Sequence, residues 1–159
     1  MFTVTKNYGT SEIDASIKAI DFSKLRYKIM KEEKWSEEKC INAESQYKKW
    51  LTVKKENPDI NIVPSKFIDE FWHYHILDTE SYYNDCKNVF GYFLHHYPYF
   101  GIYGDEDEQN LNDAFLETCR LYEERFGEKM DEEYVASRCE GHACHSPSAC
   151  ACRSPGACR

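Results

Sequence analysis

Apolar residues recur at intervals of three and four along most of the chain, which is the spacing that places them on one face of an α-helix. Between residues 22 and 29 the apolar positions are Phe22, Leu25 and Ile29. A longer stripe covers residues 40–51 and consists of Cys40, Ala43, Tyr47, Trp50 and Leu51. The two stripes predict two consecutive helices, each of which buries one face.

The sequence also indicates where the second of these helices begins and ends. Ser36 stands before two glutamates, and a serine can cap free backbone N–H groups while acids suit the positive end of a helix. The Asn-Pro-Asp sequence at 57–59 ends the helix. A short extended segment at 60–63 then leads to the Pro-Ser pair at 64–65, which we interpret as the start of the next helix.

Three more helices are predicted downstream by the same periodicity. Their apolar faces are Phe67, Ile68, Phe71, Trp72 and Ile76; Tyr82, Tyr83, Cys86, Val89 and Phe90; and Leu111, Phe115, Thr118, Tyr122 and Phe126. Gly91 and Gly127 are expected to end the last two, and a shorter helix is expected over 131–138. No stretch alternates like a strand, so the fold class is all-α: a small helical bundle with a loop-rich segment around 91–104.

The last twenty residues differ in composition from the rest of the chain. They contain no aromatic residue, no branched aliphatic residue and no lysine. Residues 144–150 and 152–158 repeat the unit Cys-x-Ser-Pro-x-Ala-Cys. Such a segment cannot bury enough apolar surface to offset its chain entropy unless something crosslinks it. We therefore divide the chain into a helical metal-binding domain (1–139) and a cysteine- and histidine-rich tail (140–159).

Charge and hydropathy exclude several classes of protein. Twenty basic residues stand against 28 acidic ones, giving a formal charge of −8, whereas a nucleic-acid-binding protein needs a basic face. The longest apolar runs fall far short of the ~20 residues that span a bilayer, and the first residues do not read as a secretory signal. We expect a cytoplasmic protein without nucleic-acid or membrane partners. In that reducing compartment, clustered cysteines are metal ligands or redox thiols more often than disulfides.

The densest concentration of candidate metal ligands lies between residues 69 and 96, which hold four of the six histidines. Asp69 and His73 are four residues apart and share a helix face, so the carboxylate can ligate the same ion or orient the imidazole. His75 lies about 200° around the helix from His73. Either the helix is distorted there, or only one of these histidines binds an ion directly.

The remaining candidates of this region lie on the next helix and in the loop that follows it. His95 and His96 are adjacent in a loop, so one of them is better placed than the other to reach a shared ion. Asp85 is a further possible ligand or orienting group. Cys86 is interpreted as a core residue because it belongs to an apolar stripe.

These motifs together resemble the glycine-rich domain-containing protein-like family. The resemblance rests on Pro-Ser at 64–65, the Asp-x-x-Trp-His-x-His sequence at 69–75, Asp-Cys at 85–86 and Leu-His-His at 94–96. It covers roughly residues 20–100. It implies a helical core, and it implies that the recurrent histidines of the family correspond to His73, His75 and His96. It implies no particular reaction.

The tail offers a second set of ligands in Cys144, Cys150, Cys152 and Cys158, with His142 and His145 among them. Cys150 and Cys152 form a Cys-x-Cys pair of the sort found in thiolate clusters, and soft thiolates favour Cu(I) or Zn. Two alternatives to metal binding stay open. One is that the tail cysteines have no function. The other is that the repeated unit is a peptide that is post-translationally modified.

The leading hypothesis is a metal-binding protein with two sites. His73, His75 and His96 hold a transition-metal ion (zinc, iron or copper) in the helical domain, with Asp69 or Asp85 as a further ligand or orienting group. The tail binds soft metal through its cysteines. The domain is either a mononuclear metal enzyme or a metal-handling protein. The alternatives are a recognition domain that carries a modified peptide and a non-catalytic interaction module with core histidines.

Overall fold

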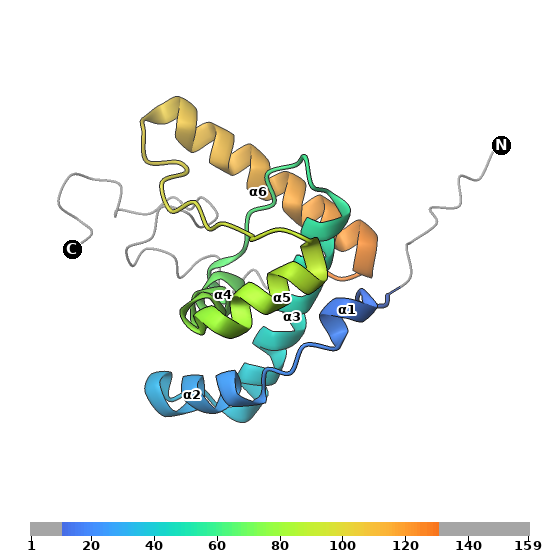
Figure 1. Cartoon of the computed structure of the whole chain (residues 1–159). Coiled ribbons are helices and arrows are strands. Elements are labelled where there is room, and N and C mark those ends of the chain that lie inside the picture. Colours follow the sequence, from blue (N-terminus) through green and yellow to red (C-terminus); the bar gives the residue numbers. More distant parts are fainter. Residues whose placement is uncertain (1–10, 131–159) are drawn as a thin grey trace.

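The computed structural model describes residues 11–130, which form six α-helices and, within that range, no strand (Figure 1). The helices are α1 (Ala15–Lys18), α2 (Ser23–Glu33), α3 (Glu37–Glu56), α4 (Lys66–Leu77), α5 (Thr79–Phe90) and α6 (Asp105–Phe126). The predicted all-α fold is confirmed, as is the loop-rich segment between α5 and α6. The expected helix at 131–138 and the tail at 140–159 lie outside the described residues.

The predicted caps occur at the helix ends. The Ser36 side chain accepts a hydrogen bond from the backbone N–H of Lys39 at 3.1 Å, and Ser65 accepts one from Ile68 at 3.3 Å. Gly91 ends α5 with a φ of 76°, in the left-handed region that a residue without Cβ adopts at little cost. Sequence alone determined these helix limits because each cap depends on residues close in the chain.

Helix α1 was not predicted, because its four residues are too few to show an apolar stripe. Asp14, the residue just before the helix, caps it by accepting a hydrogen bond from the Ser16 N–H at 3.0 Å. The second oxygen of Asp14 pairs with Lys55 Nζ of α3 at 2.9 Å. The helix therefore depends on tertiary contacts that its own sequence does not reveal.

Helix α3 lies at the centre of the fold and packs against α1, α2, α4 and α6 (Figure 1). Its inner face buries Tyr47 and Trp50 completely. The aromatic packing continues into α4, where the Phe71 ring lies 5.3 Å from both the Tyr47 and the Phe22 rings. Because a buried aromatic side chain contributes about 3–5 kcal/mol against truncation to alanine, this contact fixes α4 on α3.

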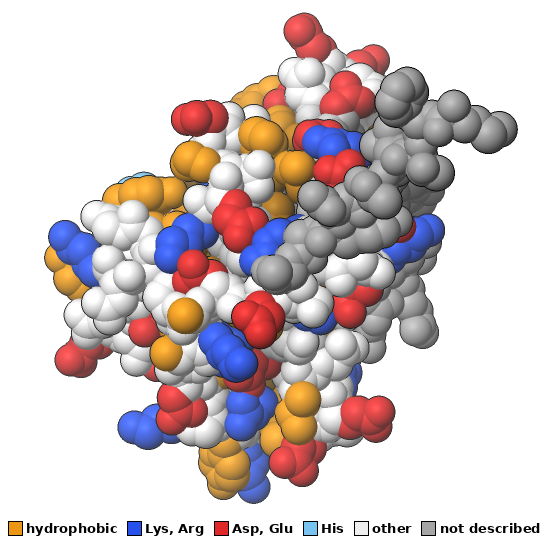
Figure 2. All heavy atoms as spheres, turned by 90° about the vertical axis from the view of Figure 1, so that its right-hand side faces the viewer, with side chains coloured by type: hydrophobic (Ala, Val, Ile, Leu, Met, Phe, Trp, Pro, Cys, Tyr) orange, Lys and Arg blue, Asp and Glu red, His pale blue; other side chains and the backbone are white. Residues whose placement is uncertain are grey.

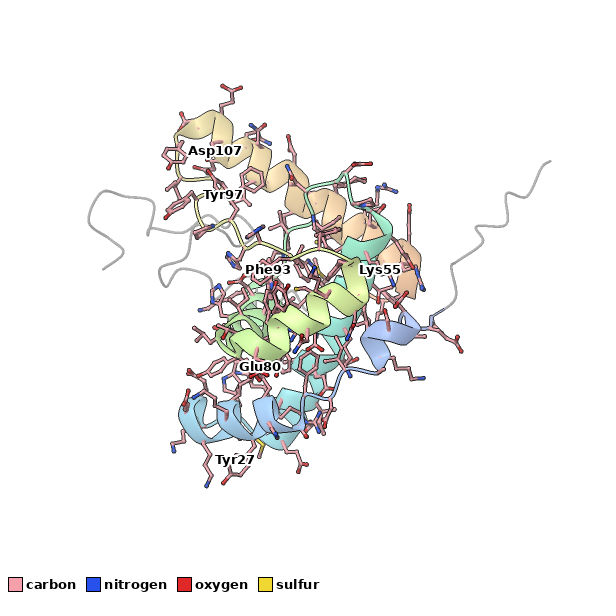
Figure 3. The ribbon with its side chains drawn as sticks, in the orientation of Figure 1. Tyr27, Lys55, Glu80, Phe93, Tyr97 and Asp107 are labelled. Atoms are coloured by element: carbon pink, nitrogen blue, oxygen red, sulfur yellow. The ribbon has the colours of Figure 1, made fainter. Side chains whose placement is uncertain are left out.

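The segment between α5 and α6 is fastened to the first turn of α6. The Asp107 carboxylate accepts hydrogen bonds from the backbone N–H groups of Gly101 at 2.7 Å and Tyr103 at 3.2 Å. Figure 3 labels Asp107 on α6 and Tyr97 on the segment that precedes it. Gly101 has a φ of 87°, and a Cβ there would lie 2.5 Å from Leu111 Cδ2. A glycine is therefore required for this close approach to α6.

Tyr82 connects α4, α5 and the following segment through one hydroxyl group. The hydroxyl accepts a hydrogen bond from Trp72 Nε1 at 3.0 Å and donates one to the Leu94 carbonyl oxygen. Burial raises the pKa of Tyr82 well above its ordinary value, so the hydroxyl stays protonated as this donor. Leu94 stands two residues before His96, and the Tyr82 hydroxyl thus fixes the backbone that leads to that histidine.

The surface carries charges of both signs. On the face shown in Figure 2, acidic and basic side chains are interspersed, with apolar side chains between them. Within residues 11–130, no helix combines the length and apolar character needed to cross a bilayer.

Replacing Tyr82 by phenylalanine is expected to lower the free energy of unfolding by about 1–3 kcal/mol, because the buried Trp72 N–H and Leu94 carbonyl each lose a partner. Tyr83→Phe is the control, because the Tyr83 side chain is half exposed, and it should change stability by less than about 0.5 kcal/mol. Urea denaturation measures both values. Equal stability of the two variants would contradict the role given to Tyr82.

Candidate metal centre

Helix α4 presents Asp69 and His73 on one face, one turn apart. The Asp69 side chain is fully buried, whereas the His73 side chain is 35% exposed. Asp69 Oδ2 lies 3.0 Å from His73 Nε2. The i, i+4 relation predicted from the sequence is therefore present, and it exists because α4 is a regular helix through both residues.

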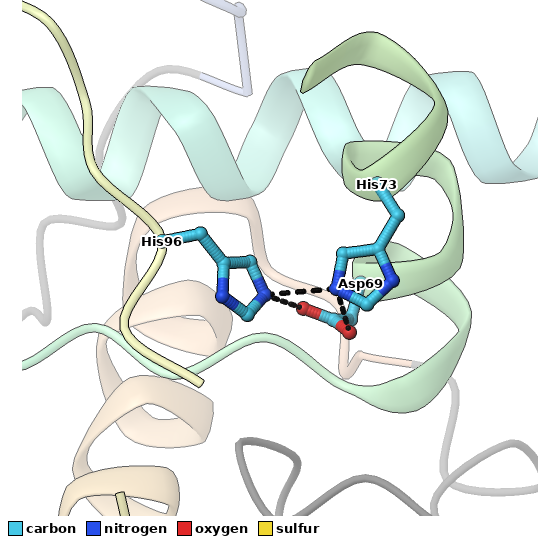
Figure 4. Close-up of side chains that lie close together, drawn as sticks. All are labelled: Asp69, His73 and His96. Atoms are coloured by element: carbon cyan, nitrogen blue, oxygen red, sulfur yellow. Dashed lines mark hydrogen bonds and ion pairs between the residues drawn. The ribbon is translucent and has the colours of Figure 1, made fainter. Parts of the chain in front are cut away.

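His96 reaches the same carboxylate from the segment after α5 (Figure 4). Its Nε2 lies 2.8 Å from Asp69 Oδ1 and 3.0 Å from His73 Nε2. The three side chains thus bring two imidazole nitrogens and a carboxylate to one point. They are the group of described residues whose ligand atoms lie close enough together to hold a metal ion.

The separations among Asp69, His73 and His96 match those of ligands around one ion. Donor atoms that lie about 2.0–2.2 Å from a metal, at angles of roughly 90–110°, are about 2.8–3.6 Å from each other. The contacts here, at 2.8, 3.0 and 3.0 Å, lie in the lower part of that range, with His73 and His96 each contacting a different oxygen of Asp69. One ligand atom from each of the three residues lies within 4.8 Å of the others.

Hydrogen bonds alone do not account well for the three close contacts among Asp69, His73 and His96. Each Nε2 atom carries at most one hydrogen, and a carboxylate carries none. Two hydrogens at most are therefore available for the three contacts, of which two end on the Asp69 carboxylate and one joins the imidazoles. If both imidazoles donate to Asp69, two N–H groups face each other across the 3.0 Å between His73 and His96. A metal ion resolves this conflict because it attracts a lone pair from all three groups at once.

Trp72 supports His96 from the side. The two rings lie 4.4 Å apart at an angle of 37°, and the Trp72 indole is itself held by its hydrogen bond to Tyr82. Asp69, Trp72 and His73 all belong to α4, so one helix supplies two of the candidate ligands and the wall for the third. Residues of α4 therefore hold His96 in position, although His96 itself lies in a loop.

The structure places His75 and Asp85 in a different cluster. His75 projects from the other side of α4, where its Nδ1 lies 2.9 Å from the Tyr47 hydroxyl and its Nε2 lies 2.8 Å from Asp85 Oδ2. Burial raises the pKa of Tyr47 well above its ordinary value, so its hydroxyl keeps the proton that it can donate. Because a carboxylate only accepts hydrogen bonds, Nε2 of a neutral His75 ring carries the hydrogen towards Asp85, and Nδ1 accepts from Tyr47. Both ring nitrogens are engaged.

His75 was expected to share an ion with His73 and His96, and the structure does not bring it to them. The physical reason is the rotation of about 200° between positions two apart on a regular helix. Cys86 lies in the core, as predicted, and burial raises the pKa of its thiol. His95 is exposed, and its ring packs against Phe93. Cys144, Cys150, Cys152 and Cys158 lie outside the described residues.

A cavity of about 380 Å³ lies beside the Asp69–His73–His96 group. His96 and Trp72 form part of its wall, and α3 contributes Trp50 and Lys54. Neither this cavity nor the position of Lys54 is predicted from the sequence. A pattern of apolar spacing carries no signal for either, since both depend on how α3 and the segments around residues 62 and 97 meet.

The model of the UCP032817-like family matches residues 13–136, which is most of the chain. The chain belongs to the UCP032817-like family. The resemblance to the glycine-rich domain-containing protein-like family was therefore wrong. It rested on short motifs of common residues, and the continuous match over nearly all of the helical domain of this UCP032817-like protein outweighs them. Comparison with curated proteins and with solved structures gives no match.

Tyr47→Phe is expected to destabilise the protein by about 1–3 kcal/mol, because it leaves the buried His75 Nδ1 without its donor. The control is Tyr27→Phe on α2, where the tyrosine is 63% exposed. Thermal and urea unfolding measure the difference. If Tyr47→Phe unfolds like the control, the hydrogen bond between Tyr47 and His75 does not stabilise the core.

Proposed function

We propose that this protein binds one divalent transition-metal ion through Asp69, His73 and His96. One observation carries the proposal: the Nε2 atoms of His73 and His96 lie 3.0 Å from each other, and each lies within 3.0 Å of an oxygen of the buried Asp69 carboxylate. A cation between these three groups would bind the Asp69 carboxylate and both imidazoles at once.

The donor set narrows the identity of the metal. Two imidazoles and one carboxylate form the ligand set of mononuclear iron sites and resemble that of catalytic zinc sites. Closed structural zinc sites have four protein ligands, whereas the group formed within residues 11–130 has three. An ion with three protein ligands keeps coordination positions for water, dioxygen or a substrate. We therefore favour a mononuclear metal enzyme over a storage protein.

We propose different roles for the residues of the site. Asp69, His73 and His96 are the proposed ligands. Trp72 is a positioning residue that packs on His96. His75 and Asp85, the other two candidates, are proposed to stabilise the junction of α4, α5 and α3 rather than to touch the ion, because both His75 nitrogens are already engaged.

The metal content of alanine variants tests this assignment. The background is the full chain with serine in place of Cys144, Cys150, Cys152 and Cys158, so that tail thiolates do not contribute. We expect one zinc or iron ion per chain, and we expect His73→Ala and His96→Ala to lower metal affinity by about 10- to 100-fold or more, as loss of even a supporting group does in metal sites.

Two variants serve as matched controls for the metal measurement. His95→Ala removes the exposed neighbour of His96, and Cys86→Ala removes the buried thiol between the histidine pairs. Both should keep their metal in elemental analysis after dialysis. Metal retained in His73→Ala, or an equal loss in His95→Ala and His96→Ala, would contradict the site. A metal-free parent protein would favour the interaction module instead.

The cysteine-rich tail is proposed to bind soft metal separately from the helical domain. Titration of the full chain with Cu(I) or Zn(II) should then show more bound ions than titration of the four-serine variant. Free thiols have a pKa near ~8.5, so binding must release protons and should weaken as the pH falls towards ~5. Equal capacity of the two proteins would contradict a tail site.

We favour a shared cluster of all four thiolates, because a single alanine separates Cys150 from Cys152. Replacing Cys144 and Cys150 by serine should then abolish tight binding by the tail rather than halve it. Mass spectrometry of protein from the native host tests the alternative. A covalent mass change confined to residues 144–158 would identify the tail as a modified peptide.

A further inference from the structure

The cavity beside the metal-ligand group has the size and lining of a small-molecule site. Its volume of about 380 Å³ lies near the lower end of the ~300–1,000 Å³ typical of ligand pockets. Aromatic rings form part of the wall: Trp50 from α3, Trp72 from α4, and Tyr97 and Phe100 from the segment between α5 and α6. A small, flat ligand fits a site of this kind better than a chain-like one.

The indole of Trp72, backed by that of Trp50, forms a preformed aromatic part of the cavity wall. Their rings lie 4.8 Å apart at an angle of 47°, and both residues are buried to at least nine-tenths. Trp72 also packs on His96, so a ring seated in the cavity lies next to one of the proposed metal ligands. Aromatic side chains favour offset or edge-to-face contact with another ring.

Lys54 supplies a cationic group to the same wall. Its Nζ donates a long hydrogen bond of 3.4 Å to the Ile60 carbonyl oxygen, and it forms no ion pair with a carboxylate of residues 11–130, in contrast to its neighbour Lys55, which pairs with Asp14. Burial lowers the pKa of Lys54 because it disfavours the charged ammonium. An anion in the cavity would offset that penalty.

We propose that this cavity binds a small aromatic carboxylate, whose ring packs against Trp72 and the neighbouring aromatic side chains of the wall and whose carboxylate pairs with Lys54. Its place beside His96 makes such an acid the substrate class of the metal centre, and that part of the inference rests on the proposed function. Binding of the acid to the cavity does not, because Lys54 and the two indoles are not metal ligands.

Phenylacetate is the probe, and calorimetric titration of the four-serine full chain with and without one equivalent of Zn(II) is the measurement. Two compounds of similar shape control for charge: the neutral phenylacetamide and the cationic 2-phenylethylamine. Lys54→Met removes the ammonium while it keeps a side chain of similar length. Lys55→Met, one residue further along α3, is the matched control for loss of a lysine.

We expect phenylacetate to bind the metal-free protein and to bind Lys54→Met about 10- to 100-fold more weakly, which is the effect of losing a hydrogen bond to a charged group. Lys55→Met should bind it as the parent does, and phenylacetamide should bind the parent about as weakly as phenylacetate binds Lys54→Met. Equal affinity for the acid and the amide, an unchanged affinity in Lys54→Met, or no binding of phenylacetate would overturn the proposal.

The two proposals fail in different ways. Phenylacetate binding that needs Lys54, in a protein that takes up no metal, would support the cavity and overturn the metal centre. Stoichiometric metal binding without any affinity for phenylacetate would support the metal centre and overturn the cavity proposal. If both hold, Zn(II) should change the affinity for phenylacetate, since the acid and the ion both lie against His96. An affinity that does not respond to bound metal would overturn the link between the two sites.

Discussion

The buried carboxylate of Asp69 is the constraint on which the arrangement of this domain depends. A buried charge is expensive unless other groups pair with it, and Asp69 is paired by His73 from its own helix and His96 from a segment 27 residues away. These contacts require α4 to be regular and the segment after α5 to return across it. The Tyr82 hydroxyl and the Asp107 carboxylate hold that segment in place.

The same helix serves two different polar clusters because its faces are separate. One face carries the Asp69 group, which is partly open and borders a cavity. The other carries His75, which is buried between Tyr47 and Asp85 and has both nitrogens engaged. Two histidines only two residues apart therefore have unlike chemistry: the first is accessible to an ion, and the second is part of the packing between helices.

Much of this could be predicted from sequence, where the determinants are local. Helix faces, the serine caps and the i, i+4 relation of Asp69 to His73 follow from spacing along a single helix. The partners of His75, the bridging role of Tyr82 and the exposure of Lys54 to a cavity could not be predicted, because they arise where distant segments meet. The family assignment failed for a related reason, since short motifs of common residues do not identify a whole domain.

The most direct test of the metal centre is a crystal structure of the zinc-soaked full chain, with an anomalous difference map calculated at the zinc edge. The account predicts a peak about 2.0–2.2 Å from Nε2 of His73, Nε2 of His96 and one oxygen of Asp69. It also predicts that His75 keeps its hydrogen bonds to Tyr47 and Asp85. A map without a peak between these three side chains, or with its peak at His75, would contradict it.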